Sequence, residues 1–226
     1  MSNNSFSPGI WWWLFLALFS PLVAVGLVHA VIAAVAFPMS YLWSAVGVVA
    51  FLLLNRLLIK GKDDFIRTFS HETNHAVASL LMFKKVHSFH AGTDSGVVYH
   101  TAGGRLSTVV IALAPYCLPL FSYALLLVRA VMLPQYFWIA DILIGVTIGF
   151  YISVFRQQTG CHQVDIQKFN MRLFPYWYII TFLAFNASII IVSLMPEKNV
   201  VLAFADTFVD YWRSIVDVFS VLFMKK

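Results

Sequence analysis

The feature that most constrains this chain is a series of apolar runs long enough to cross a lipid bilayer as helices. One crossing needs about 20 apolar residues, and 61% of the 226 residues are hydrophobic while only 11% are charged. A backbone in lipid must satisfy its own hydrogen bonds, which favours helices. The pattern predicts an all-α polytopic membrane protein, a single integral domain over residues 1–226, with about six transmembrane helices at 10–37, 41–59, 65–83, 106–132, 137–155 and 174–195.

The charged residues lie mainly at the ends of these runs, and the net charge of +5 is modest. This distribution is typical of a topology signal and not of a nucleic-acid-binding surface, so no nucleic-acid partner is expected. Basic residues concentrate in 56–67 and again in 156–172. By the positive-inside rule, both loops and the N-terminus are predicted to face the cytoplasm.

Two segments depart from the apolar pattern. Residues 86–102 combine β-branched, aromatic and histidine residues around a turn at 92–96, which predicts a small β-hairpin. Residues 200–224 carry one polar stripe on an otherwise apolar helix, which predicts a C-terminal amphipathic helix. Such a helix either lies in the membrane interface or spans with its stripe turned into the bundle, and we expect the first. The stripe consists of Asp206, Asp210, Arg213 and Asp217.

The third run contains the motif HETNH at residues 71–75. In a helix, His71 and His75 lie one turn apart, about 6 Å along the axis, so both can reach one zinc ion. Glu72 lies on the flank of the same face, where a carboxylate can take a proton from a metal-bound water. The alternative is a helix that merely packs two histidines. Ionisable groups within apolar sequence are costly, which favours the functional interpretation.

The stretch SHETNHAVASLLMFKKVHSFHAGTDSGVVYHTAGGRLSTVVIALAP resembles the site-2 proteases, the intramembrane zinc metalloproteases. The resemblance covers roughly residues 65–168 and is greatest to their short bacterial branch, which has no PDZ domain. It implies Zn²⁺ held by His71, His75 and Asp165, with Glu72 as the catalytic base and a catalytic core over about 65–172. It also implies a transmembrane protein as substrate and the bacterial inner membrane as location. The apolar runs predict the lipid bilayer as surroundings, and the basic residues 56–67 before the motif place the active site nearer the cytoplasm.

The chain departs from the family pattern at two places. The usual glycine before the second motif histidine is Asn74 here, and Asp165 lacks the Pro-rich, Asp-Gly context of longer members. Cys161 and His162 are therefore alternative third ligands, and Asp141 is a more distant one. Candidates for contact with substrate or for support of the ligands are Asn74, Gly96 and Asn186.

Two classes of function follow from these observations. The first is an intramembrane zinc metalloendopeptidase that hydrolyses a peptide bond in or near a transmembrane segment. The second is a non-proteolytic membrane sensor, binder or transporter whose metal is structural. Glu72 discriminates between them, because a purely structural site has no need of a carboxylate that does not bind metal.

Overall fold

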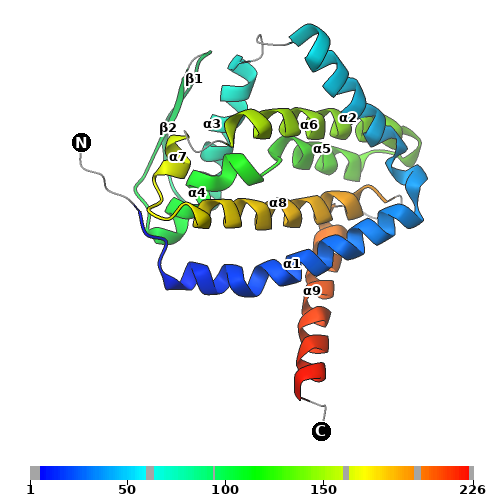
Figure 1. The fold of residues 1–226 in the computed structure, drawn as a ribbon. Helices are drawn as coiled ribbons and strands as arrows, with labels where there is room; N and C mark the ends of the chain where they lie inside the picture. The colour runs from blue at the N-terminus through cyan, green and yellow to red at the C-terminus, as the bar shows by residue number, and fades with distance from the viewer. Residues whose placement is uncertain (1–5, 60–63, 94, 160–162, 196–199, 224–226) are drawn as a thin grey trace.

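The computed structural model describes residues 6–59, 64–93, 95–159, 163–195 and 200–223. Within these ranges the protein is mostly helical and has one two-stranded sheet (Figure 1). A π-helical turn over Asn55–Ile59 follows α2. The elements are α1 (Ile10–Ala36), α2 (Leu42–Leu54), α3 (Asp64–Leu81), β1 (Val86–Ala91), β2 (Gly96–His100), α4 (Arg105–Cys117), α5 (Leu120–Val131), α6 (Phe137–Gln158), α7 (Val164–Gln167), α8 (Leu173–Ser193) and α9 (Val200–Phe223).

Four helical segments of the described chain are long and apolar enough to cross a membrane: Ile10–Ala36, Pro38–Leu57, Pro134–Gln158 and Leu173–Ser193. A fifth crossing results if the bent pair α4 and α5 counts as one span. The six expected spans are therefore not confirmed. The helix with the HETNH motif, α3, is not among the candidates, because Asp64, Arg67 and Glu72 lie within its 18 residues.

The apolar helices α2 and α6 pack through glycine. A Cβ atom on Gly47 would lie 2.1 Å from the carbonyl oxygen of Ile142, and one on Gly145 would lie 2.0 Å from that of Ser44. The two backbones are thus in direct contact, as in small-residue crossings of membrane helices.

The expected fourth span, 106–132, is broken and not merely kinked. Its halves α4 and α5 meet at 77°, and the break falls at Leu118 and Pro119. Proline has no N–H and cannot continue the hydrogen bonds of a helix. The freed carbonyl of Cys117 accepts a hydrogen bond from Asn186 Nδ2 at 2.9 Å, while Tyr123 donates its hydroxyl to Asn186 Oδ1 at 2.5 Å. Asn186 therefore stabilises the break.

The predicted hairpin is confirmed. Strands β1 and β2 pair antiparallel, with Ala91 opposite Gly96 and Phe89 opposite Val98, and the register shifts between Val86 and Ser88. The ring of Phe89 contacts Phe69 of α3 edge-on, with the two centroids 5.8 Å apart. This contact holds the hairpin against the helix that carries the motif.

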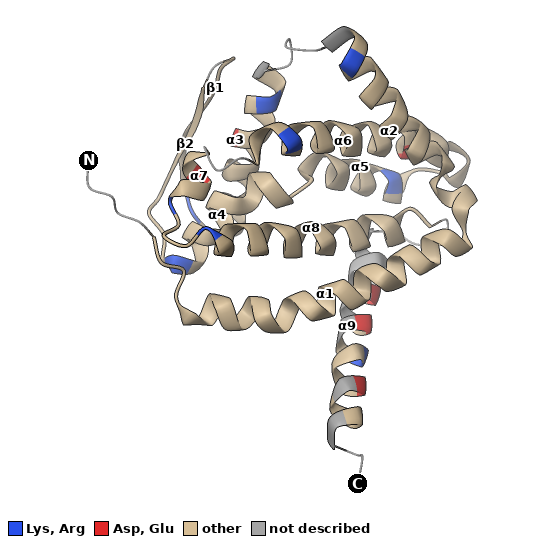
Figure 2. Ribbon diagram, viewed as in Figure 1, with Lys and Arg blue, Asp and Glu red and all other residues tan. Residues whose placement is uncertain are grey.

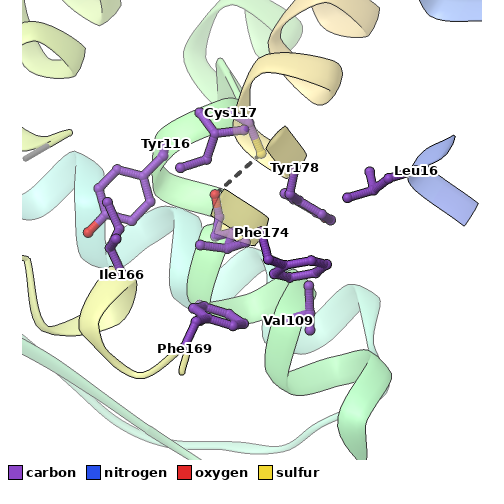
Figure 3. Packing of buried hydrophobic residues seen from close by; sticks show 11 residues of the cluster. Leu16, Val109, Tyr116, Cys117, Ile166, Phe169, Phe174 and Tyr178 are labelled. Carbon is purple, nitrogen blue, oxygen red and sulfur yellow. Dashed lines mark hydrogen bonds between the residues drawn. The ribbon is translucent and has the colours of Figure 1, made fainter. Parts of the chain in front are cut away.

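The largest buried cluster joins α1, α4, α7 and α8 (Figure 3). Ile166 of the short helix α7 is inserted into it with only 4% of its surface exposed. Phe169, Phe174 and Tyr116 are also members. Burial of such side chains contributes about 1.5–3 kcal/mol each. Because Asp165 directly precedes Ile166, this cluster fixes the position of the Asp165 carboxylate.

The positively charged residues are concentrated at one end of the molecule. Lys and Arg gather mostly around the hairpin, α7 and the adjoining helix ends (Figure 2).

Helix α9, the expected C-terminal helix, runs across the direction of α1 and α8 (Figure 1). An interfacial helix would have this orientation. Its Asp206, Asp210 and Arg213 line a pocket that they share with His29 of α1.

Candidate metal centre

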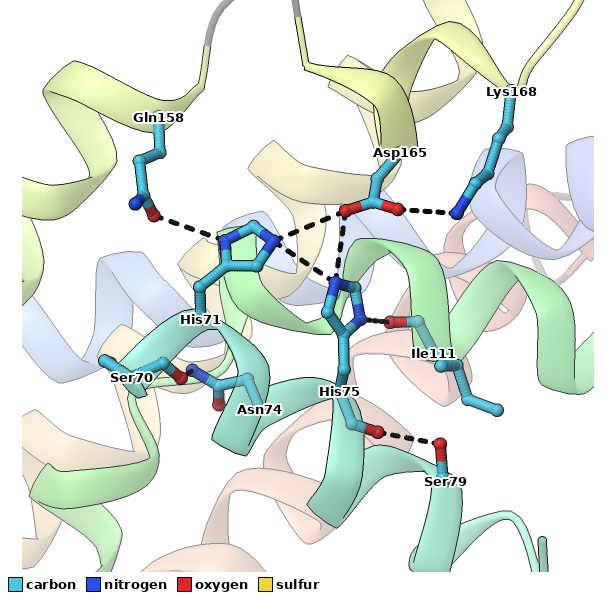
Figure 4. A network of polar contacts seen from close by, with 9 residues as sticks. All are labelled: Ser70, His71, Asn74, His75, Ser79, Ile111, Gln158, Asp165 and Lys168. Atoms are coloured by element: carbon cyan, nitrogen blue, oxygen red, sulfur yellow. Dashed lines mark hydrogen bonds and ion pairs between the residues drawn. The ribbon is translucent and has the colours of Figure 1, made fainter. Parts of the chain in front are cut away.

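Three side chains from two distant segments converge on one point. His71 and His75 extend from α3 toward Asp165 on α7 (Figure 4). Asp165 Oδ2 lies 3.3 Å from Nε2 of His71 and 3.1 Å from Nε2 of His75. The two Nε2 atoms are 3.2 Å apart. All three residues are only partly exposed.

These distances fit a zinc ion. Ligand atoms 2.0–2.1 Å from a tetrahedral zinc lie about 3.3–3.4 Å from one another. The triangle of two Nε2 atoms and one Oδ2 atom matches three corners of that tetrahedron within a few tenths of an ångström. Two histidines and one carboxylate also form a ligand set found in catalytic zinc sites, where the fourth position takes water or substrate.

The second nitrogen of each histidine is held by the protein. His75 Nδ1 donates to the carbonyl oxygen of Ile111 at 2.7 Å, an atom that can only accept. His71 Nδ1 lies 3.2 Å from Gln158 Oε1. With the proton on Nδ1, each Nε2 presents its lone pair to the centre of the triangle. Metal-binding histidines usually have such supporting partners, which fix the ring and its tautomer.

The carboxylates of the site differ in electrostatic environment. Burial alone would raise the pKa of Asp165, but the close contacts of its Oδ2 with the imidazoles of His71 and His75, together with the charge of Lys168, hold that pKa well below its usual range. Lys168 Nζ lies 2.7 Å from the other oxygen of Asp165. Burial raises the pKa of Glu72, and the nearby His75 and His71 partly oppose this rise. Asp165 is thus ionised, as metal ligation requires, and Glu72 is the more basic carboxylate.

A cavity of about 710 Å³ opens onto the triad and Glu72. Strand β2 forms one side of it and α7 with the end of α6 forms another, while α3 and α4 supply the remaining wall. The cavity therefore leaves room for a fourth metal ligand and for a bound peptide. Its lining includes Thr68, Glu72, Gly96, Val97, Val98, His100, Thr108, Gln158 and Lys168.

Gly96 lies directly against Glu72. A Cβ atom at position 96 would be 2.4 Å from Glu72 Cγ and 2.7 Å from Glu72 Oε1, and it would also be 2.7 Å from Thr68 Cγ2. Distances under 3.0 Å are essentially never found for real Cβ atoms, so any larger residue at position 96 would displace Glu72, Thr68 or the start of β2. Of the three residues expected to contact substrate or support the ligands, Gly96 is the one that borders the cavity.

The other two lie elsewhere. Asn74 is buried and donates to the carbonyl of Ser70, facing a small pocket beside Pro119 at the helix break. Asn186 bonds to Cys117 and Tyr123 at the same break. Neither lines the large cavity. Asn186 thus satisfies polar groups at the broken helix, whereas Asn74 bonds within α3 and its Oδ1 is buried without a hydrogen-bond partner among the described residues.

Of the three alternative third ligands, only Asp141 lies in the described part of the chain. Asp141 is paired with Arg129, whose Nε lies 2.7 Å from Asp141 Oδ1 and whose other nitrogens donate to the carbonyls of Ser193 and Leu194. Arg129 thus pairs with Asp141 and also satisfies the carbonyl groups at the end of α8. Asp141 is not part of the group formed by His71, His75 and Asp165. Cys161 and His162 fall outside the described residues.

Sequence reasoning missed Gln158 and Ile111 as partners of the histidines. Gln158 carried one available signal, because it is a polar residue at the end of an apolar run near the basic loop. For Ile111 the signal was indirect: Pro115, four residues later in α4, has no N–H to bond the Ile111 carbonyl, which is therefore free to accept from His75. No protein-family model, curated protein or solved structure matches this chain.

Proposed function

We propose that the protein is an intramembrane zinc metalloendopeptidase, which hydrolyses a peptide bond in or near a transmembrane segment of another membrane protein. The observation that carries the proposal is the triangle of His71 Nε2, His75 Nε2 and Asp165 Oδ2 beside a buried Glu72 that has no place in the triangle. A structural zinc site would close the fourth position with another protein ligand. Here that side faces a cavity of about 710 Å³.

Each residue then has a distinct task. His71, His75 and Asp165 hold the ion, which when bound supplies Lewis acidity toward a carbonyl and lowers the pKa of water. Glu72 accepts the proton of the attacking water and returns it to the leaving amine. Gln158 and Ile111 keep the two imidazoles oriented. Loss of a general base typically lowers the rate about 10²–10⁴-fold.

The substrate would bind as an extended strand. In the two-stranded sheet, β2 pairs with β1 along one edge, and consecutive residues of β2 line the cavity. A peptide can add to such an edge through main-chain hydrogen bonds. A carbonyl of that peptide would then lie between Glu72 and the metal ligands. Since peptide bonds in a helix are already hydrogen-bonded, the substrate helix must unwind locally first.

The proposed orientation has the metal centre near the cytoplasmic face of a bacterial inner membrane. Its support is the concentration of Lys and Arg around the hairpin and α7 (Figure 2) and the tendency of basic residues to remain on the cytoplasmic side. The site also lies at the end of an apolar span and not at its midpoint, because Gln158 is the last residue of α6 and Asp165 follows on α7.

The test is the substitution Glu72→Gln, compared with His71→Ala. Purified protein with one equivalent of Zn²⁺ is incubated with unfolded casein and with a library of single-span reporter proteins. Wild type should cleave, Glu72→Gln should keep zinc and lose cleavage, and His71→Ala should lose both. A Glu72→Gln protein that cleaves at the wild-type rate would overturn the proposal and favour a non-proteolytic protein with a structural metal.

A further inference from the structure

A second concave site lies where the beginning of α1 meets the beginning of α4. It is a groove of about 510 Å³ that shares no lining residue with the cavity over the metal ligands. Residues 8–12, Phe15 and Leu106 form its walls, and Arg105 lies at one end. Arg105 is the only charged residue in the lining. Sites for small molecules commonly combine an apolar wall with one or a few placed polar groups.

The floor of the groove is rigid and its rim faces outward. Trp12 packs edge-on against Tyr178 and Phe174, with ring centroids 5.6 and 6.3 Å away, so it belongs to the buried cluster. Trp11 on the rim is 79% exposed and Leu106 is 60% exposed. An exposed indole at the start of an apolar span is typical of the boundary between lipid and water. The groove therefore opens toward the membrane interface.

The polar end of the groove carries a guanidinium group with no carboxylate partner among the described residues. The carboxylates of Asp141 and Asp165 are paired with Arg129 and Lys168 instead. Arg105 Nη1 lies over Gly9, 3.4 Å from the point where a Cβ would be, and Gly9 has a φ of +82° that favours glycine. The backbone therefore bends at Gly9, and the guanidinium of Arg105 packs against this bend at the end of the groove.

Two further features make this end favourable for an anion. Arg105 is the first residue of α4, and Gly104 before it provides no side-chain cap, so the N–H groups of the first turn carry partial positive charge. Lys84 does not line the groove but adds a positive charge to this region, because its Cε lies 3.2 Å from the Cβ position of Gly103, two residues before Arg105. A guanidinium forms paired hydrogen bonds with phosphate oxygens. A headgroup with a net negative charge is favoured here over a zwitterionic one, whose own cation offsets the charge of its phosphate.

We propose that this groove binds an anionic phospholipid, with an acyl chain along Trp11, Phe15 and Leu106 and the phosphate against Arg105 and the first turn of α4. The apolar length of the groove favours a lipid over free phosphate, which would occupy only the polar end. This proposal is independent of the peptidase activity, because the groove and the metal ligands share no residue.

The experiment measures lipid retention. Delipidated protein in detergent is mixed with equal amounts of phosphatidylglycerol and phosphatidylcholine of the same acyl chains, and bound lipid is counted by native mass spectrometry. Wild type should retain phosphatidylglycerol about tenfold over phosphatidylcholine, because both headgroups carry the phosphate but only that of phosphatidylcholine has a cation that offsets the phosphate charge beside Arg105. Arg105→Gln should remove the preference, whereas Arg172→Gln, an exposed basic residue outside the groove, should keep it.

A second variant tests the apolar part. Trp11→Ala removes one wall and leaves the polar end intact, so it should lower the retention of both lipids while keeping their ratio. Inorganic phosphate at the lipid concentration should not displace bound phosphatidylglycerol. An unchanged preference in Arg105→Gln, a loss as large in Arg172→Gln, or unchanged retention in Trp11→Ala would each overturn the proposal.

Discussion

Asp165 Oδ2 lies 3.1 Å from Nε2 of His75, although 90 residues separate them in the chain. The two are brought together by Ile166 and Phe169, which anchor α7 in the cluster shared with α1, α4 and α8. The Asp165 carboxylate is thus held in position because the next residue, Ile166, is buried in this apolar cluster. A metal ligand built in this way is independent of the helix that supplies the histidines.

Asp165→Ala should weaken zinc binding strongly. With one of three ligands removed, the affinity should fall by more than the roughly 10–100-fold that follows loss of a supporting hydrogen bond. Zinc content after dialysis against a graded chelator measures the effect. Asp141→Asn is the matched control, because this buried carboxylate pairs with Arg129 and not with the histidines. Normal zinc affinity in Asp165→Ala would show that another residue is the third ligand.

Gln158→Leu should lower zinc affinity by about 10–100-fold without abolishing binding. The substitution removes the acceptor for His71 Nδ1 and so frees the ring to rotate or to change tautomer. Gln157→Leu is a close control, since the neighbouring glutamine bonds to Arg67 and not to a histidine. Equal affinities of the two variants for zinc would show that Gln158 does not orient His71.

The helical elements and the two motif histidines were predictable from sequence because their signals are local. Apolar runs of about 20 residues and a spacing of four in a helix need no knowledge of the tertiary fold. Asp165 was reached only through the resemblance to site-2 proteases, since α7 has four residues and no pattern of its own. The contact of Gly96 with Glu72 depends on how the hairpin docks on α3, which no local pattern encodes.

The number of spans was harder to predict for a physical reason. Hydropathy treats 106–132 as one apolar run, yet Pro119 and the hydrogen bonds of Asn186 turn it into two helices that meet at 77°. Asn186 looked like a functional residue because a polar side chain within an apolar span is costly. Its partners in the structure, Cys117 and Tyr123, show that the cost is offset by satisfying a broken helix.

Asn186→Leu should therefore destabilise the fold while leaving the metal ligands in place. The substitution leaves the Cys117 carbonyl and the Tyr123 hydroxyl without this partner, at a cost of about 1–2 kcal/mol. Thermal unfolding in detergent should show a lower midpoint, with zinc content unchanged in the folded protein. Ser193→Ala, which removes a buried hydroxyl bonded only within α8 at Ile189, should have a smaller effect. A larger effect of Ser193→Ala would contradict this account of the break.

Gly96→Ala should lower the cleavage rate by about 100-fold while zinc remains bound. The added methyl group would lie 2.4 Å from Glu72 Cγ, so either the Glu72 carboxylate or the start of β2 must move. Displacement of a reacting group by about 1 Å can cost on the order of 10²-fold in rate. None of the three metal ligands contacts this methyl position among its nearest atoms, so zinc affinity should be close to that of wild type.

Gly104→Ala provides the control for Gly96→Ala, because a Cβ at position 104 meets no atom within 4 Å and the residue has an ordinary φ of −75°. This variant should keep both zinc and cleavage of the reporter proteins. Comparing zinc content with cleavage rate in the two alanine variants separates the position of the base from the integrity of the metal site. If Gly96→Ala cleaves as fast as Gly104→Ala, then close packing of β2 on Glu72 is not required for catalysis. If it loses zinc as well, the hairpin supports the ligands in addition to the base.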